Sequence, residues 1–168
     1  MSRVAQSNHY TFYRYLMIFF FSGSRSSELL RIKKKDVNLE LREFKITILK
    51  GNRPFEIRKP ILGQALEFWT EIVQKARNED YLFTKDLEPS DIQINPNQIT
   101  KRWYRLVKKR FDIEEDFYSL KHLFMMSCDR QHLKTLTGHT NNETENIYLV
   151  NSESLKLEQA KKIVISFE

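Results

Sequence analysis

Five side chains suited to phosphate chemistry or proton transfer lie in the C-terminal part of the sequence: Tyr118, Lys121, His122, His139 and Tyr148. The run that contains them, residues 116–150, predicts short helices broken near residues 127–129 and 138–142, because glycine and polar residues interrupt its apolar periodicity. Tyr148 follows His139 by nine residues, with a polar stretch between them that can form a compact loop. A compact loop could therefore bring an imidazole and a phenol to one cleft.

Two further cations lie at predicted turns in the N-terminal half. Arg25 follows Gly23, which breaks an apolar helix, and Lys50 opens a Lys-Gly-Asn turn between two predicted strands. On its own, Arg25 is better explained as a surface partner of Glu28 one turn on, and Lys50 or Arg53 as solvated turn residues. These cations gain a functional meaning only together with the C-terminal motifs.

The order and spacing of these motifs resemble the tyrosine recombinase (phage integrase) family. That family has a Gly-x-Arg-x-x-Glu-Leu box, a lysine at a hairpin tip, a basic box on a helix, a Gly-His turn and a later tyrosine. The matching stretches here are residues 23–29, Lys50, residues 119–122, 136–140 and 147–148. The resemblance, from about Thr11 to Val150, implies that DNA is cut and rejoined through a 3′-phosphotyrosine intermediate during integration or excision of a mobile element.

The resemblance also implies a role for each matching residue. Tyr148 would be the nucleophile, and Lys50, brought close to Arg25 by the hairpin tip, would protonate the departing 5′-oxygen. Arg25, Lys121 and His139 would bind the nonbridging phosphate oxygens, on which negative charge develops. We expect neither a metal nor another cofactor, because the energy of the broken phosphodiester bond is kept in the phosphotyrosine.

The second box departs from the family pattern. Tyr118 and Lys121 stand where the family usually has histidine and arginine. Lysine keeps the charge but lacks the bidentate guanidinium, and a tyrosine hydroxyl is a poor base near neutral pH. The neighbouring His122 could compensate as a phosphate ligand, or it could be packed in the core. Phosphate binding should survive this change more easily than the rate of cleavage does.

Three functions therefore stay open. The first is an active tyrosine site-specific recombinase, and the second is a degenerate relative that binds DNA without cleaving it. The third is a helical interaction domain whose basic face is only solvated, which leaves the coincident motif positions unexplained. In the first two cases the partner is double-stranded DNA. The family suggests self-association on DNA through the C-terminal segment, a predicted helix after residue 155, with a monomer in its absence; packing on its own body is the simpler alternative.

The periodicity of the chain predicts an α+β fold that is mainly helical, like that of tyrosine recombinase catalytic domains. An apolar helix over residues 10–21 precedes a short helix over residues 25–32, with Ser24 as its N-cap. Alternating apolar residues over 36–60 predict a three-stranded antiparallel meander. Helical spacing then returns over residues 62–76.

A further predicted helix, residues 96–111, is basic on one face and apolar on the other. Its cations are Lys101, Arg102, Arg105, Lys108 and Lys109. A face with five cations and no acid can track DNA phosphates, and solvated surface charge is the alternative. The formal net charge of +6 agrees with a polyanionic partner.

Length and composition predict one domain over residues 1–168, since 40% hydrophobic and 12% aromatic residues can fill one core. The chain begins almost directly at the expected catalytic domain. We therefore expect the N-terminal core-binding domain of such enzymes to be absent from it, as in a fragment or a minimal family member. The single Cys128, the lack of zinc-ligand spacing and the lack of a membrane-length apolar run favour a cytoplasmic, DNA-associated protein.

Overall fold

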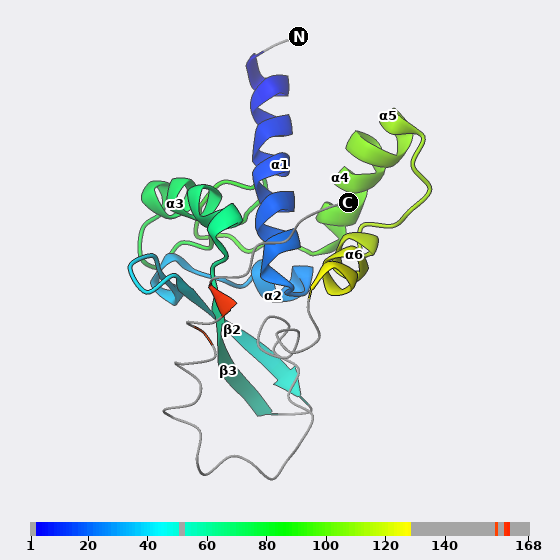
Figure 1. Ribbon diagram of the computed structural model, residues 1–168. Coiled ribbons are helices and arrows are strands. Elements are labelled where there is room, and N and C mark those ends of the chain that lie inside the picture. Colours follow the sequence, from blue (N-terminus) through cyan, green and yellow to red (C-terminus); the bar gives the residue numbers. More distant parts are fainter. Residues whose placement is uncertain (1–2, 51–52, 129–156, 158–159, 162–168) are drawn as a thin grey trace.

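The computed structural model describes residues 3–50, 53–128, 157 and 160–161, without the side chains of residues 3–8, 49–50 and 53. Its elements in chain order are α1 (Arg3–Ser22), α2 (Ser26–Leu29), the 3₁₀ helix η1 (Lys34–Asp36), β1 (Val37–Asn38), β2 (Glu43–Lys50), β3 (Arg53–Pro60), the 3₁₀ helix η2 (Gly63–Ala65), α3 (Leu66–Lys75), α4 (Asn97–Trp103), the π-helical segment η3 (Tyr104–Lys108), α5 (Lys109–Phe111) and α6 (Ser119–Ser127). Figure 1 shows α1 at the centre of the helical part, with α3 on one side and α4 to α6 on the other. The predicted fold, mainly helical with one small antiparallel sheet, is confirmed.

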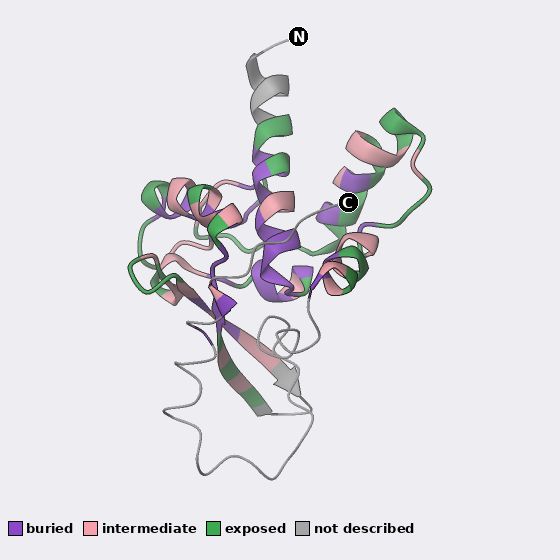
Figure 2. Ribbon diagram, viewed as in Figure 1, coloured by how far each residue is buried: buried purple, intermediate pink, exposed green. Residues whose placement is uncertain are grey.

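The C-terminal half of α1 forms the centre of the apolar core, because aromatic and aliphatic side chains occupy most of its positions. Figure 2 shows this half of α1 buried together with much of α2. Tyr15 and Phe19 pack on Phe117, which precedes α6, with ring centroids 6.3 and 4.3 Å away. The prediction that residues 10–21 are buried is wrong at Tyr10 and Tyr13, which are 47% and 50% exposed, whereas Arg14, the one charged residue of this run, is fully buried.

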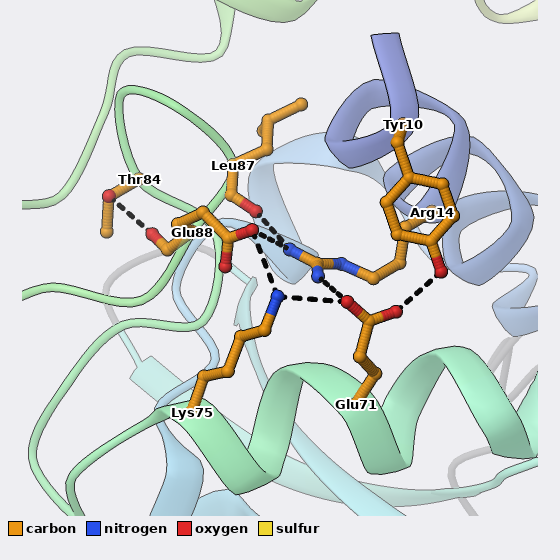
Figure 3. A network of polar contacts seen from close by, with 7 residues as sticks. All are labelled: Tyr10, Arg14, Glu71, Lys75, Thr84, Leu87 and Glu88. Carbon is orange, nitrogen blue, oxygen red and sulfur yellow. Dashed lines mark hydrogen bonds and ion pairs between the residues drawn. The ribbon is translucent and has the colours of Figure 1, made fainter. Parts of the chain in front are cut away.

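Arg14 can be buried because its guanidinium has partners on several sides (Figure 3). Its Nη1 donates to Glu71 Oε1 on α3 at 2.7 Å, and its Nη2 donates to the Leu87 carbonyl oxygen at 2.8 Å and lies 3.1 Å from Glu88 Oε1. Lys75 Nζ lies 2.9 Å from Glu71 and 3.3 Å from Glu88. A buried charge is stable only where ion pairs and hydrogen bonds replace water. The network therefore fixes α1 against α3 and against the loop that contains Leu87.

The sheet has the predicted antiparallel order β1-β2-β3. β1 is only two residues long, since the chain turns directly after it. β2 and β3 form a regular hairpin in which Phe44 pairs with Lys59 at the base and Lys50 pairs with Arg53 at the tip. Phe44 stacks on Trp69 of α3 at 4.8 Å, which anchors the base. In Figure 1 the hairpin extends from the helical part beside α2, at the end opposite to the N-terminus.

α2 is shorter than the predicted helix. The prediction that Ser24 caps it is also wrong, because the N-cap is Arg25, whose backbone N–H donates to Glu28 Oε2 at 2.7 Å. Ser24 is instead fully buried and accepts a hydrogen bond from Lys59 Nζ. Gly23 ends α1 as predicted, with a φ of 56°, a conformation that glycine adopts readily.

Three other predicted helices are present. η2 and α3 occupy the region predicted from residue 62 to 76, and α6 ends at Ser127, at the predicted break. The basic helix runs from Asn97 to Phe111 as α4, η3 and α5. None of the helices within the described ranges is long and apolar enough to cross a membrane.

Near the C-terminal end, Leu157 and Ala160 are helical and buried. Lys161 Nζ lies 3.4 Å from Glu43 Oε1 on β2. The described part of this segment therefore contacts its own chain, which was the simpler alternative. Association with a second copy on DNA stays a prediction.

Replacing Glu71 with glutamine should remove part of the acid sensitivity of the fold. Partial burial tends to raise the pKa of Glu71, but hydrogen bonds from Tyr10 and Lys75 and the charge of Arg14 lower it to about 2 from an ordinary value of 4.5. The stabilisation from this carboxylate is therefore present above pH 4.5 and is lost as the pH falls towards 2. We expect the free energy of unfolding of Glu71→Gln, measured with urea, to fall less steeply with acidification than that of the wild type. Glu67→Gln, at an exposed position of the same helix, should keep the wild-type slope; an unchanged slope in Glu71→Gln would contradict the assignment.

Candidate active site

Arg25 lies at the N-terminal end of α2, where the chain turns out of the buried end of α1. Its Nη1 is 3.1 Å from Glu28 Oε1, so the pairing that offered an alternative explanation for this arginine is present. It is not a solvated surface pair, because the Glu28 side chain is only 9% exposed and also accepts the Arg25 backbone N–H. The Arg25 side chain is 49% exposed. Glu28 therefore anchors Arg25 while leaving the guanidinium accessible to a second anion.

Tyr118, Lys121 and His122 lie together at the start of α6. The backbone N–H groups of Lys121 and His122 donate to the Tyr118 carbonyl oxygen at 3.0 and 3.3 Å. Residues three and four apart share a helix face, so these side chains are neighbours. Tyr118 is 47% exposed, His122 is exposed and Lys121 is half-buried, so the core-packed alternative for His122 is wrong. No acidic residue occupies the first turn, where the helix dipole favours an anion.

Lys59 is a fully buried lysine that the sequence analysis did not single out. It stands at the base of β3, and its Nζ donates to Ser24 Oγ at 2.8 Å. Ser24 directly precedes Arg25 in the chain, and its backbone N–H donates to Ser22 Oγ at 3.1 Å. The sheet is thereby tied to the turn that presents Arg25.

The charges of Arg25, Lys59 and Lys121 act on one another. Burial lowers the pKa of Lys121, with Glu28 opposing and Arg25 reinforcing this shift. Burial also lowers the pKa of Lys59 to about 7, with Glu28 opposing and Lys121 and Arg25 reinforcing. We call Arg25, Lys59, Lys121 and Glu28 the cation cluster. Because it holds three cations and one carboxylate, the cluster favours binding of an anion.

The position of the hairpin tip relative to the cluster follows from the register. Lys59, at the Arg25 end of the hairpin, pairs with Phe44, whereas Lys50 pairs with Arg53. The β2 residues from Phe44 to Lys50 extend over about 20 Å at ~3.3 Å per residue. The base of the hairpin is therefore the part that adjoins Arg25, and the approach of the Lys50 side chain to Arg25 stays a prediction.

His139 and Tyr148 lie outside the described residues. Their proximity to the cation cluster and their roles stay predictions. Of the five residues predicted to be catalytic, the structure thus brings Arg25 and Lys121 into one electrostatic group.

The basic helix is more engaged with the rest of the chain than predicted. Arg102 donates to the Lys85 carbonyl oxygen, and Lys108 Nζ lies 3.3 Å from Asp116 Oδ1. Lys101 and Arg105 are exposed. The π-helical segment η3 also changes the helical phase between the cations before it and those after it. The five cations therefore do not form the single uncommitted face that a regular α-helix would give.

The structure also contains a groove that lies apart from the cation cluster. An open groove along α3 is lined by Gly63, Leu66, Glu67, Thr70, Glu71 and Gln74, none of which belongs to the cluster. Within the part of the chain that the structure describes, no three His, Cys, Asp or Glu side chains are grouped as metal ligands.

The burial of Lys59 could have been found from the strand pattern. Phe55, Ile57 and Lys59 alternate along β3, so they share the face that is more buried than that of Glu56 and Arg58. A lysine in register with apolar residues on a buried face is uncommon, and it indicates either a paired charge or a functional group.

The arrangement of these elements defines a class of protein. In fold, the helices around α1 and the small antiparallel sheet match solved recombinase and integrase structures. The integrase from mycobacterium phage Brujita superposes with a TM-score of 0.64 at 15% identity, over 98% of this chain and 58% of that one. The XerA recombinase superposes with a TM-score of 0.61 at 14% identity, over 96% of this chain and 57% of that one.

The chain belongs to the phage integrase family, whose model matches residues 1–154. It is 25% identical over 166 residues to a probable integrase/recombinase of Acholeplasma phage L2, covering 94% of this chain and 55% of that protein. The Tn1549 transposon integrase, solved in complex with a circular intermediate DNA, superposes with a TM-score of 0.55 at 16% identity, over 83% of this chain and 53% of that one. The chain thus spans little more than half the length of these relatives.

Replacing Lys59 with methionine should change how stability depends on pH. The pKa of Lys59 is lowered by burial to about 7 from an ordinary value of 10.5. Between these values the unfolded chain binds more protons than the folded chain, so the penalty for burying the charged amine is complete below pH 7 and is relieved as the pH rises. The unfolding free energy of the wild type should therefore rise relative to that of Lys59→Met by up to about 1.4 kcal/mol per pH unit in this window.

Lys45→Met is the matched control, because it removes a partly exposed lysine, which pairs with Glu56, from the neighbouring strand. It should leave the pH dependence of the unfolding free energy unchanged. Parallel curves for the wild type and Lys59→Met would show that Lys59 carries an ordinary pKa in the folded chain.

Proposed function

We propose that this chain is the catalytic domain of a tyrosine recombinase that cuts and rejoins double-stranded DNA. Tyr148 attacks a DNA phosphorus, a bond forms between the phenol oxygen and phosphorus, and the bond from phosphorus to the 5′-oxygen breaks. The phenol loses its proton, and Lys50 gives a proton to the departing 5′-oxygen. The 3′-phosphotyrosine keeps the bond energy, and attack by a 5′-hydroxyl restores DNA and the free tyrosine.

The observation that carries this proposal is the grouping of Arg25 with Lys121. Arg25 comes from the first family box and Lys121 from the second, yet their charges act on one another in the folded chain. Arg25 keeps an exposed guanidinium that can hold phosphate oxygens bidentately, and Lys121 supplies a point charge beside it. Phosphoryl transfer depends chiefly on positioning and on such stabilisation of developing negative charge. His139 would add a hydrogen bond to a nonbridging oxygen.

A degenerate, DNA-binding relative is the second candidate. It is favoured by the second box, in which Tyr118 and Lys121 replace histidine and arginine. The cation cluster supports phosphate binding under both proposals, so it does not separate them. Formation of a covalent adduct with DNA separates the two proposals.

Tyr148→Phe should abolish covalent attachment to DNA while leaving noncovalent binding almost unchanged, because it removes only the hydroxyl group. The assay uses a nicked duplex that carries the recombination site, from which the short strand is lost after cleavage so that the adduct accumulates. Adduct is then measured on a denaturing gel, with the intact integrase if this chain binds too weakly. An adduct that still forms with Tyr148→Phe would show that another residue is the nucleophile. No adduct from the intact wild type would favour the degenerate relative.

Lys121→Arg should maintain or raise the rate of adduct formation if Lys121 clamps phosphate, because the guanidinium restores a bidentate fork. The rate is measured in single-turnover reactions with the same nicked duplex. Lys35→Arg makes the same chemical change at an exposed lysine paired with Glu79 and should have no effect. A large loss of rate in Lys121→Arg would indicate that the site requires the shape or the proton of lysine.

We also propose that the basic helix contributes phosphate contacts around the cleavage site. Lys101 and Arg105 are exposed, as phosphate-binding side chains must be. Arg102, which also bonds to the Lys85 carbonyl oxygen, is a weaker candidate. Association with a second copy through the C-terminal segment, and a DNA-associated location in the cytoplasm, belong to the same proposal.

Reversing Lys101 or Arg105 to glutamate should weaken binding to duplexes of any sequence. Each lost phosphate contact should lower the slope of log affinity against log salt by roughly one. Fluorescence anisotropy at several salt concentrations measures both effects. Arg102→Glu should also loosen the contact with Lys85, so its thermal stability should fall as well. Unchanged affinity and slope in the Lys101 and Arg105 variants would show that the cations of this helix are only solvated surface charges.

A further inference from the structure

Among the residues that the structure describes, the buried amine of Lys59 has no carboxylate as a hydrogen-bond or ion-pair partner. Within the described residues, its Nζ has one hydrogen-bond partner, the Ser24 hydroxyl, whereas a protonated lysine has three donors. Arg14 shows what this fold provides for a buried cation that stays charged: two carboxylates and a carbonyl oxygen. Lys59 lies in an environment that holds a neutral amine comfortably and an ammonium poorly.

The charged groups that act on Lys59 are those of the cation cluster. Glu28 and Arg25 act on its charge from α2 and its N-cap, and Lys121 acts on it from α6. The Glu28 carboxylate already accepts hydrogen bonds from the Arg25 side chain at 3.1 Å and from the Arg25 backbone N–H at 2.7 Å. The one carboxylate of the cluster is thus already hydrogen-bonded to Arg25. The two other cations, Arg25 and Lys121, both disfavour a charged Lys59.

The charge of the cluster depends on Lys59. Three cations and one carboxylate leave +2 when Lys59 is protonated and +1 when it is neutral. A bound phosphodiester carries one negative charge, and its pentacoordinate transition state carries more. A phosphate bound by Arg25 and Lys121 would therefore raise the pKa of Lys59, because a nearby anion favours the ammonium form.

We propose that Lys59 is a positioning residue of the phosphate site, which holds the turn before Arg25 through Ser24 and takes up a proton when a DNA phosphate enters the cluster. Lys59 is fully buried, so it acts through Ser24 and through its charge without touching the phosphate. Proton uptake adds positive charge when the substrate brings negative charge, and proton loss relieves the repulsion among the cations when the site is empty. The pKa of Lys59, lowered to about 7 in the free protein, leaves the amine largely neutral at a mildly basic pH and ready to accept the proton. The inference rests on the proposed function, because DNA supplies the anion.

The test is proton uptake on DNA binding. A duplex of arbitrary sequence is titrated into this chain by calorimetry at about pH 8, in two buffers that differ in ionisation enthalpy, since Lys59 is then mostly neutral in the free protein and an ordinary lysine is not. The buffer dependence of the binding enthalpy gives the number of protons taken up. We expect the wild type to take up as much as about one proton per bound site, Lys59→Met to lose this uptake, and Lys45→Met to keep it.

The outcomes separate this inference from the proposed function. Binding with equal uptake by the wild type and Lys59→Met, or binding by the wild type without uptake, overturns the role of Lys59 alone. Failure of the wild type to bind DNA at all overturns the proposed function and this inference with it. If Lys59→Met does not fold, the wild type decides by NMR: the ε-carbon of Lys59 should titrate near pH 7 in the free protein and shift upwards with DNA. Titration at the ordinary lysine value without DNA overturns the inference.

Discussion

The buried hydrogen bond between Lys59 and Ser24 is the contact on which the geometry of the candidate site depends. It connects the base of the hairpin to the turn between α1 and α2, and that turn presents Arg25. Because Ser24 has no exposed surface, the turn cannot shift without breaking this bond or moving the packed end of α1. The position of Arg25 is therefore set by the sheet and the core together, and Glu28 then fixes the direction of its guanidinium.

The two fully buried cations of the described structure serve different purposes. Arg14 has its charge matched by Glu71 and Glu88, and the network that results holds α1 against α3. Lys59 donates a hydrogen bond to the Ser24 hydroxyl, and the charges of Lys121 and Arg25 help to lower its pKa. An arginine cannot give up its proton in a protein, so its buried charge needs carboxylate partners, whereas a lysine can respond to burial by becoming neutral. The fold thus uses the permanent cation for structure and places the titratable one beside the candidate site.

The sequence predicted the elements better than it predicted the placement of charge. Apolar periodicity located α1, the hairpin, α3 and the basic helix, because the burial of apolar faces dominates folding. It failed for Arg14 and Ser24, because the partners that make their burial possible come from distant parts of the chain, such as Glu71 and Lys59. The family motifs identified Arg25 and Lys121 as candidate site residues, but they did not identify Lys59. The sequence marked Lys59 only as a lysine in register with Phe55 and Ile57 on one face of a strand. No local rule states that a buried face will adjoin a phosphate site.

The departure in the second box and the buried lysine have a common physical consequence. Replacing an arginine by Lys121 keeps one positive charge but gives up the planar fork that would orient a phosphate. In the proposed site, orientation of the phosphate would then come from Arg25, which increases the importance of the contacts that hold its turn in place. Lys59 does so through Ser24, and the charge of Lys121 helps to lower the pKa of Lys59. The proposed site would thus rely on one anchored guanidinium for direction and on two lysines for charge, and one of these lysines, Lys59, also holds the turn that anchors the guanidinium.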